Sequence, residues 1–178
     1  LAVDADGRVY VSDAFANRIR RFVPGSNIEA FAGTGVSGFS GDQGPAVEAE
    51  IKTPGLLAID STGTLYLVDR GNRRLRSITP EGIITTVAGT DPCCAPRAHD
   101  SPGANALSVR SPLAAGLAID NDGNIFLSES GIESSRSVIY KIETDGRIWP
   151  LVVSNNPGFQ GDGGPAALAE LNEVKGLA

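Results

Sequence analysis

Leu57-Ala58-Ile59-Asp60-Ser61-Thr62-Gly63-Thr64-Leu65-Tyr66-Leu67-Val68-Asp69 is the middle copy of a pattern that this chain carries three times. The first copy begins at Leu1 and the third at Leu117, so successive copies start 56 and 60 residues apart. A further copy opens at Leu177. Repeats of this length are typical of supersecondary units that bury their apolar faces against neighbouring units. We therefore expect one structural unit to recur along the chain.

Each unit contains short runs that predict β-strands. In the first copy, residues 8–12, 18–22 and 28–31 alternate between apolar and polar side chains, which is the period of a strand. Tight-turn residues separate the runs, and a long excursion follows the last one. Four strands joined by tight turns predict a propeller blade. The innermost strands should be the apolar runs at residues 1–3, 57–59 and 117–119, which suit burial on both faces.

The predicted fold class is therefore all-β, a β-propeller segment of three four-stranded antiparallel blades. The blades are expected at residues 1–56, 57–116 and 117–176, with residues 177–178 opening the next repeat, all within one incomplete domain. The chain of 178 residues has no methionine and starts and stops inside its own repeat, so we expect a segment of a longer protein. Open blade faces should expose apolar surface at both ends. The isolated segment should then be unstable, dimerise into a ring, or sit in a larger assembly.

Composition narrows the function classes. The formal net charge is −6, which argues against nucleic acid as a partner because phosphates require a basic surface. No apolar run approaches the ~18 residues that span a bilayer, and no signal peptide is visible. Cys93 and Cys94 are adjacent. They are interpreted as small loop residues, as a bridge to another part of the protein, or as a vicinal disulfide suited to an oxidising compartment.

Two excursions are nearly identical in sequence. Residues 38–46 read GFSGDQGPA and residues 158–166 read GFQGDGGPA. Together with the strand pattern, these loops resemble the NHL-repeat family over essentially the whole chain. The resemblance implies a six-bladed β-propeller, of which three repeats would be half. The third repeat departs from the pattern: Glu129 replaces the motif aspartate, the Asn-Arg pair is missing, and residues 131–134 are inserted.

Two groups of charged residues have competing interpretations. The Asp4-x-Asp6-Gly7 and Asp120-x-Asp122-Gly123 runs resemble the start of a calcium loop, but Asp and Gly are also turn residues. The second repeat keeps only the first aspartate and the glycine, which favours the turn and predicts no metal. Pairs between Asp13 and Arg18 and between Asp69 and Arg74 could line a charged pocket. Their repetition favours structural ion pairs that fix the loop within each blade.

The remaining candidates lie in loops. His99 is the only histidine, and one histidine cannot supply a metal site, so we expect it to be exposed to solvent. The GFxGD loops are the best functional candidates. Their alternative role is architectural, with the phenylalanine tucked under the loop and Asp42 or Asp162 capping a short helix that follows.

These observations favour a non-enzymatic platform that needs no cofactor and binds a protein or glycan partner, or a second propeller half. A propeller lyase or lactonase with metal ligands in other blades, and the extracellular sensor of a receptor or kinase, are the alternatives. An extracytoplasmic or organelle-lumen location is favoured. The net charge favours a neutral or basic partner.

Long connections (residues 33–55, 89–115 and 153–174) should share one face with the shorter loops (13–17, 69–73 and 129–135). On that face the candidate partner-binding residues are Phe39, Asp42, Arg70, His99, Glu133, Phe159 and Asp162.

Overall fold

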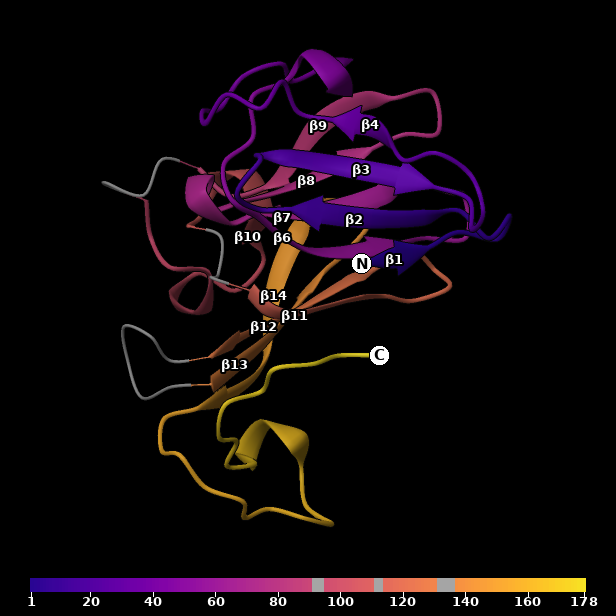
Figure 1. Cartoon of the computed structure of the whole chain (residues 1–178). Coiled ribbons are helices and arrows are strands. Elements are labelled where there is room, and N and C mark those ends of the chain that lie inside the picture. The colour runs from indigo at the N-terminus through magenta and orange to yellow at the C-terminus, as the bar shows by residue number, and fades with distance from the viewer. Residues whose placement is uncertain (91–94, 111–113, 131–136) are drawn as a thin grey trace. The chain divides into compact units, whose positions relative to one another are not determined.

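The computed structural model describes residues 1–90, 95–110, 114–130 and 137–178 (Figure 1). Within these ranges the chain is all-β, with short 3-10 turns and no α-helix. The predicted fold class is confirmed. The strands are β1 (Ala2–Val3), β2 (Val9–Asp13), β3 (Arg18–Phe22), β4 (Glu29–Ala32), β5 (Gly44–Pro45), β6 (Pro54–Ile59), β7 (Leu65–Asp69), β8 (Arg74–Ile78), β9 (Ile83–Ala88), β10 (Ala104–Asn105), β11 (Ala114–Ile119), β12 (Ile125–Ser130), β13 (Ser137–Ile142) and β14 (Arg147–Ser154). The 3-10 turns are η1 (Ala46–Glu48), η2 (Arg70–Asn72), η3 (Ala98–Asp100), η4 (Ala106–Ser108) and η5 (Ala166–Leu168).

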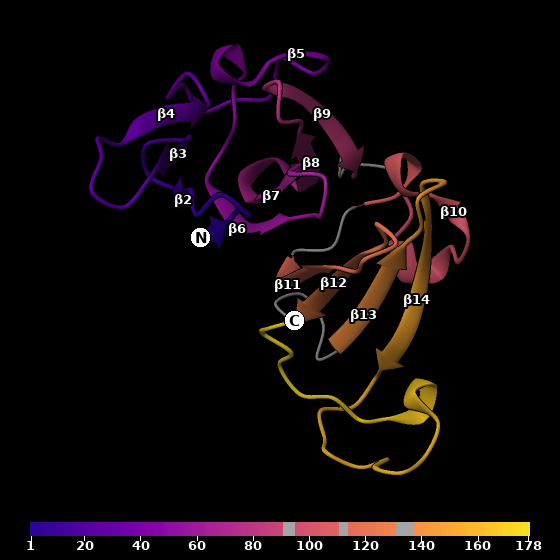
Figure 2. The same cartoon turned by 90° about the vertical axis from the view of Figure 1, so that its right-hand side faces the viewer.

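The chain divides into two compact units, Leu1–Val87 (unit 1) and Ala88–Ala178 (unit 2). Unit 1 holds two antiparallel sheets with strand orders β1-β2-β3-β4 and β5-β9-β8-β7-β6. Unit 2 holds one sheet with order β10-β14-β13-β12-β11, whose four long strands lie side by side in Figure 2. In every sheet, four strands that are consecutive in the chain also lie in chain order and pair antiparallel with their neighbours.

Two sheets contain a strand that sequence reasoning did not predict. Residues Gly44–Pro45 of β5 pair with β9, and Ala104–Asn105 of β10 pair with β14. Each added strand comes from the excursion that precedes its sheet, so these sheets have five strands rather than the expected four. The first sheet has no such addition among the described residues, and β4 lies at its edge.

Burial follows the packing of the sheets in unit 1. Its core includes Ile19, Leu65 and Ile84, which are at most 1% exposed. The predicted burial of the innermost strands holds for Leu57, which is 8% exposed. It is wrong for Leu1, which is 77% exposed. Leu57 is covered because β6 packs against both β2 and β1.

The first turn of each repeat has a shared hydrogen-bond pattern. Oδ1 of Asp4, Asp60 and Asp120 accepts a hydrogen bond from the backbone N–H two residues later and from the N–H four residues later. The glycine that follows adopts φ of 77° at Gly7 and 84° at Gly123, a conformation that other residues resist. These three aspartates therefore lie in hydrogen-bonded turns of the same form.

Candidate functional site

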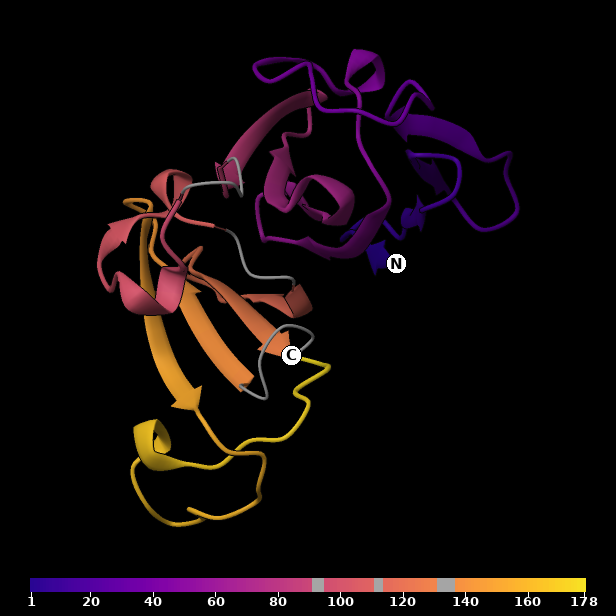
Figure 3. The same cartoon turned by 90° about the vertical axis from the view of Figure 1, so that its left-hand side faces the viewer.

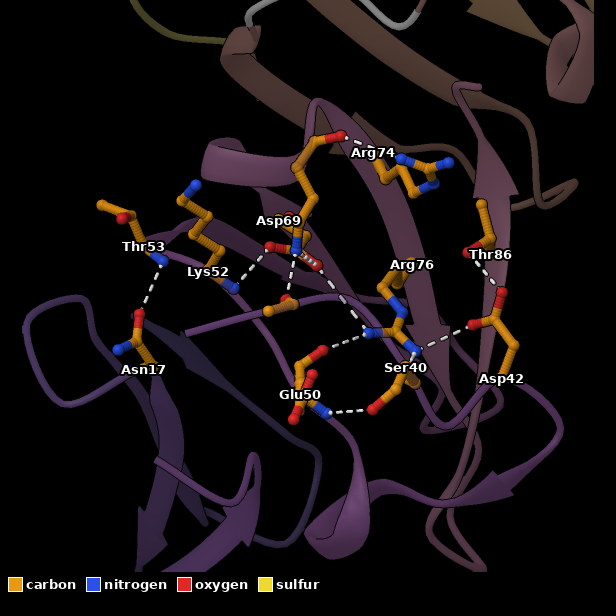
Figure 4. Close-up of polar contacts among 12 residues, drawn as sticks. Asn17, Ser40, Asp42, Glu50, Lys52, Thr53, Asp69, Arg74, Arg76 and Thr86 are labelled. Atoms are coloured by element: carbon orange, nitrogen blue, oxygen red, sulfur yellow. Dashed lines mark hydrogen bonds and ion pairs between the residues drawn. The ribbon is translucent and has the colours of Figure 1, made fainter. Parts of the chain in front are cut away.

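The loop at residues 38–46 closes over a buried arginine of the next sheet (Figure 4). Arg76 projects from β8 and its side chain is completely buried. Its Nη2 donates to the Ser40 carbonyl at 2.8 Å and to Asp42 Oδ1 at 2.8 Å, and its Nη1 donates to the Glu50 carbonyl at 3.0 Å. Asp42 Oδ2 accepts from the Thr86 hydroxyl on β9 at 2.7 Å. The loop therefore holds the guanidinium from several sides, and Asp42 joins two strands.

A second carboxylate, that of Asp69, lies buried beside the Arg76 guanidinium. Asp69 of β7 is 0% exposed, and its Oδ2 lies 3.7 Å from Arg76 Nη1. Burial raises the pKa of Asp69, while hydrogen bonds from the Asn72 amide and the Lys52 backbone N–H and the charge of Arg76 act in the opposite direction. Removing Arg76 would take away a charge that stabilises the buried Asp69 carboxylate, which is costly.

Phe39 belongs to the same arrangement. Its ring centroid lies 4.0 Å from Arg74 Cζ and 5.0 Å from Arg76 Cζ, within the range of cation–π attraction. The ring is still 40% exposed. The predicted helix-capping role of Asp42 is wrong: Pro45 occupies the N-cap position of η1 and makes no side-chain cap. Asp42 binds Arg76 and Thr86 instead.

The predicted aspartate–arginine pairs are not the ones that form. Each aspartate pairs with the arginine two residues further along the next strand. Asp69 pairs with Arg76 rather than Arg74, and Asp13 pairs with Arg20 at 3.8 Å rather than with Arg18. Arg74 does lie opposite Asp69 in the strand register, but its Nη1 donates to the Asn72 carbonyl. A long side chain two positions along a strand stays on the same face and reaches the diagonal neighbour. Asp69 orders the neighbouring loop through hydrogen bonds from the Lys52 N–H at 2.8 Å and the Asn72 amide at 2.9 Å.

In unit 2 a tyrosine stands where the arginine stands in unit 1. Tyr140 lies opposite Leu127 as Arg76 lies opposite Leu67, and Glu129 takes the position of Asp69. The Tyr140 hydroxyl donates to Glu129 Oε2 at 3.0 Å. Burial, and then the Glu129 charge, raises the pKa of Tyr140 far above its usual value.

The predicted exposure of His99 is wrong. Its side chain is 7% exposed, and Nδ1 lies 3.1 Å from the Tyr140 hydroxyl. The cause is η3, which packs against β14. Of the other candidates, Arg70 is exposed on η2, and Phe159 and Asp162 are exposed in unit 2. Glu133, Cys93 and Cys94 lie outside the described residues.

The loops of unit 1 that were expected to share a face are joined by hydrogen bonds. Asn17 Oδ1 accepts from the Thr53 N–H at 3.0 Å, and Asn72 Nδ2 donates to the Gly38 carbonyl at 2.7 Å. We call the exposed side chains of Phe39, Lys52 and Arg70 on this side the loop face. On the opposite side, where the tight turns lie, a cavity of about 270 Å³ is lined by residues that include Arg8, Tyr10 and Thr62.

Several carboxylates of unit 1 are engaged by arginine and tyrosine side chains of the chain itself. Across the part of the chain that the structure describes, no group of three or more His, Cys, Asp or Glu side chains could hold a metal ion. The Asp4 carboxylate accepts hydrogen bonds from the Arg8 and Tyr10 side chains. Desolvation raises the pKa of Asp4, but these bonds and those from backbone N–H groups outweigh it, so the pKa is lowered. In the same described ranges, no helix is both long and apolar enough to cross a membrane.

Comparison with known proteins gives partial matches in sequence. No family model matches the chain. Mouse teneurin-3 is 37% identical over 105 residues, which is 51% of this chain and 4% of teneurin-3. Human teneurin-4 is 37% identical over 92 residues, 44% of this chain and 3% of teneurin-4. The Arabidopsis thaliana protein SUPPRESSOR OF QUENCHING 1, chloroplastic, is 32% identical over 74 residues, 41% of this chain and 7% of that protein. The chain thus spans less than a tenth of the length of these relatives.

Solved structures define the fold. A protein of unknown function from Bacteroides thetaiotaomicron matches 98% of this chain with a TM-score of 0.65 and 16% identity, over 40% of its own length. A streptogramin B lyase matches 88% with a TM-score of 0.54 and 17% identity, over 40% of its length. A gluconolactonase from Xanthomonas campestris matches 86% with a TM-score of 0.52 and 13% identity, over 46% of its length. These neighbours are β-propeller-like, and the chain has the fold of a propeller segment.

Proposed function

We propose that this chain is an NHL-type propeller segment of three repeats that acts without catalysis, as a platform for a protein or glycan partner. The observation that carries the proposal is the fixed loop face of unit 1. Asp42, Asp69 and Arg76, the groups that could have done chemistry, are engaged in holding the loop. Functional contacts in β-proteins concentrate on loops positioned by a rigid scaffold.

The side chains of the loop face suit molecular recognition. Phe39 offers an aromatic surface beside Arg74, and Lys52 and Arg70 are exposed cations. Aromatic residues and arginine are the residue types enriched at interface centres. The net charge of the whole chain favours a basic or neutral partner, but these local cations favour carboxylates or neutral polar groups at the point of contact. A partner with an apolar group flanked by such polar groups fits best.

Location and organisation form part of the proposal. The repeats at residues 1–56, 57–116 and 117–176 would be consecutive blades of a larger protein, outside the cytoplasm or in an organelle lumen. The competing function is a metal-dependent lyase or lactonase, since proteins with those names share the fold. Such an enzyme would need ligands from outside the described residues.

The test compares two matched charge reversals. The chain is screened on a glycan array and against a panel of purified proteins. Binding is then repeated with Lys52→Glu/Arg70→Glu on the loop face and with Arg8→Glu/Arg147→Glu, two exposed arginines outside it. We expect the first pair to weaken binding by about tenfold or more, equivalent to about 1.4 kcal/mol, and the second to leave it unchanged. Loss only in the second pair, or turnover of a lactone or streptogramin dependent on added divalent metal, would contradict the proposal.

A further inference from the structure

The cavity of about 270 Å³ on the tight-turn side lies between the first and second sheets of unit 1. The first sheet, drawn in indigo near the marked N-terminus of Figure 3, packs against the second sheet through β2 and β6. One wall of the cavity comes from β2, β3, β4 and the first turn of the first sheet, and the other comes from two turns of the second sheet. Both walls are therefore supplied by two consecutive repeats, between residues 4 and 80.

The first sheet turns its core-facing side toward this cavity. Tyr10 and Arg21 lie opposite each other on β2 and β3, and Ile19 on β3 is completely buried in the core shared with the second sheet. Because side chains alternate between the two faces of a strand, Arg21 points to the same side as Ile19. Tyr10 and Phe31 are the most buried residues of the lining, and their rings meet edge to face with centroids 5.0 Å apart. The cavity thus has an aromatic side next to an arginine.

The carboxylate of Asp4 at this cavity is already saturated. Its Oδ1 accepts hydrogen bonds from the backbone N–H groups of Asp6 and Arg8. Its Oδ2 accepts from Arg8 Nη1 at 3.3 Å and from the Tyr10 hydroxyl at 3.1 Å. The two oxygens of a carboxylate offer about four acceptor positions. Asp4 therefore has no acceptor position left for a ligand.

The two arginines of the cavity, by contrast, keep unused donors. A guanidinium carries about five N–H groups. Among the described residues, the Arg8 guanidinium donates only through Nη1, whereas Arg21 donates Nε to Glu29 Oε1 at 2.6 Å and also hydrogen-bonds the Tyr10 hydroxyl. The Arg8 and Arg21 side chains are 45% and 35% exposed. The cavity therefore offers spare donors from two cations beside an aromatic surface.

The shared architecture of the repeats does not require these arginines. Tyr66 lies opposite Ser77 as Tyr10 lies opposite Arg21, and Thr64 stands in the place of Arg8. The turn of the second repeat still closes without a cation, because the Tyr66 hydroxyl reaches its turn aspartate at 3.3 Å. The arginine pair is specific to the first repeat, which is expected of a site used once rather than of a repeated structural element.

We propose that this cavity binds a small organic monocarboxylate. The Arg8 and Arg21 guanidinium groups donate to the ligand carboxylate, since the planar fork of arginine matches the two oxygens of that group. The apolar part of the ligand packs between Phe31 and Pro80, which line the two walls. Two aspartates and two arginines line the cavity, so its formal charge is balanced. The aspartates repel a dianion such as phosphate more strongly than a single negative charge, which selects the monocarboxylate.

The volume limits the ligand to a small molecule. A water molecule takes about 30 Å³ in the liquid, so the cavity has the volume of about nine waters. Ligand cavities for drug-sized molecules begin at about 300 Å³. An acid about the size of benzoate can be enclosed, whereas a folded partner cannot enter. This inference concerns the side opposite the loop face and does not rest on the proposed function.

Isothermal titration calorimetry with acetate, lactate and benzoate tests the proposal. We expect saturable binding that is strongest for benzoate, because only benzoate covers the aromatic side of the cavity. Benzamide, the uncharged analogue of benzoate, and inorganic phosphate should bind at least about tenfold more weakly. These two comparison ligands separate the contribution of the single charge from that of the ring.

Three variants locate the binding in the cavity. Arg8→Gln and Arg21→Gln should each raise the dissociation constant for benzoate by about tenfold or more. Ser61→Trp changes an exposed residue of the opposite wall, leaves both arginines in place, and should abolish binding by filling the cavity. Arg147→Gln, which changes an exposed arginine of unit 2, is the matched control and should leave the dissociation constant unchanged. Circular dichroism checks that each variant is folded.

Three outcomes would overturn the proposal. They are the absence of saturable binding of all three acids at millimolar concentrations, binding of benzoate that is indifferent to the three cavity variants, and binding of benzamide or phosphate as tight as that of benzoate. Arg8→Glu separates this site from the loop face, because it should abolish binding of the acids and leave a protein or glycan partner bound. The two proposals therefore fail independently.

Discussion

The guanidinium of Arg76 and the carboxylate of Asp42 lie 2.8 Å apart, although one belongs to β8 and the other to the excursion that leaves the first sheet. Arg76 is fully buried and Asp42 is 35% exposed, so the pair lies at the edge of the interior. Water is excluded from one side of this pair, which strengthens it relative to a surface ion pair. The excursion thus fastens two consecutive sheets of unit 1 to each other.

Replacing Arg76 by leucine should destabilise unit 1 strongly. The change removes three hydrogen bonds and the cation beside Asp69, and breaking a buried pair in this way costs about 3–5 kcal/mol. Urea unfolding at neutral pH, with Arg147→Leu on the surface as the control, measures the difference. A loss as small as that of the control would show that the buried ion pair is not needed.

The same variant should become relatively less unstable in acid. Asp69 has a raised pKa in the folded chain, so the folded state binds its proton more tightly than the unfolded state. Stability linked to this group therefore increases as pH falls from its raised pKa towards the ordinary aspartate value. Without the charge of Arg76, the pKa of Asp69 in the folded chain rises further, so the folded state gains more stability as the pH falls. We expect the stability gap between Arg76→Leu and the original chain to narrow over that pH range; a gap that widens in acid would contradict the assignment.

Tyr140→Phe should destabilise unit 2. It removes the hydroxyl that donates to Glu129 and contacts His99, and leaving a buried polar group without its partner costs about 1–3 kcal/mol. Tyr66→Phe is the matched control, because the Tyr66 hydroxyl reaches Asp60 over a longer 3.3 Å in a more exposed setting. Hydrogen exchange should show faster opening of β12 and β13 in Tyr140→Phe alone. Equal effects of the two variants would argue against a special role for this network.

Stripping divalent metals should leave the melting temperature unchanged. The carboxylates of Asp4 and Asp120 accept hydrogen bonds from their own turns and neighbouring side chains, which replaces the need for a cation. Differential scanning calorimetry with and without a chelator measures this. A clear drop in melting temperature, reversed by added calcium, would restore the calcium-loop interpretation at Asp4, Asp6, Asp120 and Asp122.

The strand pattern was predictable because it depends on local alternation and turn residues. The repeat at residues 57–69 and its two copies correctly predicted the order of the long strands. The added strands β5 and β10 were not predictable in this way, since two residues such as Gly44 and Pro45 carry no periodicity and become a strand only by pairing with β9.

The contacts of the candidate residues depended on tertiary packing. Asp69 and Arg76 were each visible as charges, but which arginine pairs with which aspartate is decided by register and by the loop that covers Arg76. His99 looked like a loop residue, and only the packing of η3 on β14 buries it beside Tyr140. That the Tyr140 hydroxyl contacts both Glu129 and His99 likewise depends on tertiary packing.

The most direct test of the central claim, that the GFxGD loop fastens one sheet by holding an arginine of the next, is a double-mutant cycle between Asp42 and Arg76. Unfolding free energies are measured for the original chain, Asp42→Asn, Arg76→Gln and the double variant. A direct charge-assisted bond predicts that the double variant loses less than the sum of the single losses, by about 1–3 kcal/mol. Losses that add within about 0.3 kcal/mol would mean that the two residues act independently, and would contradict the account.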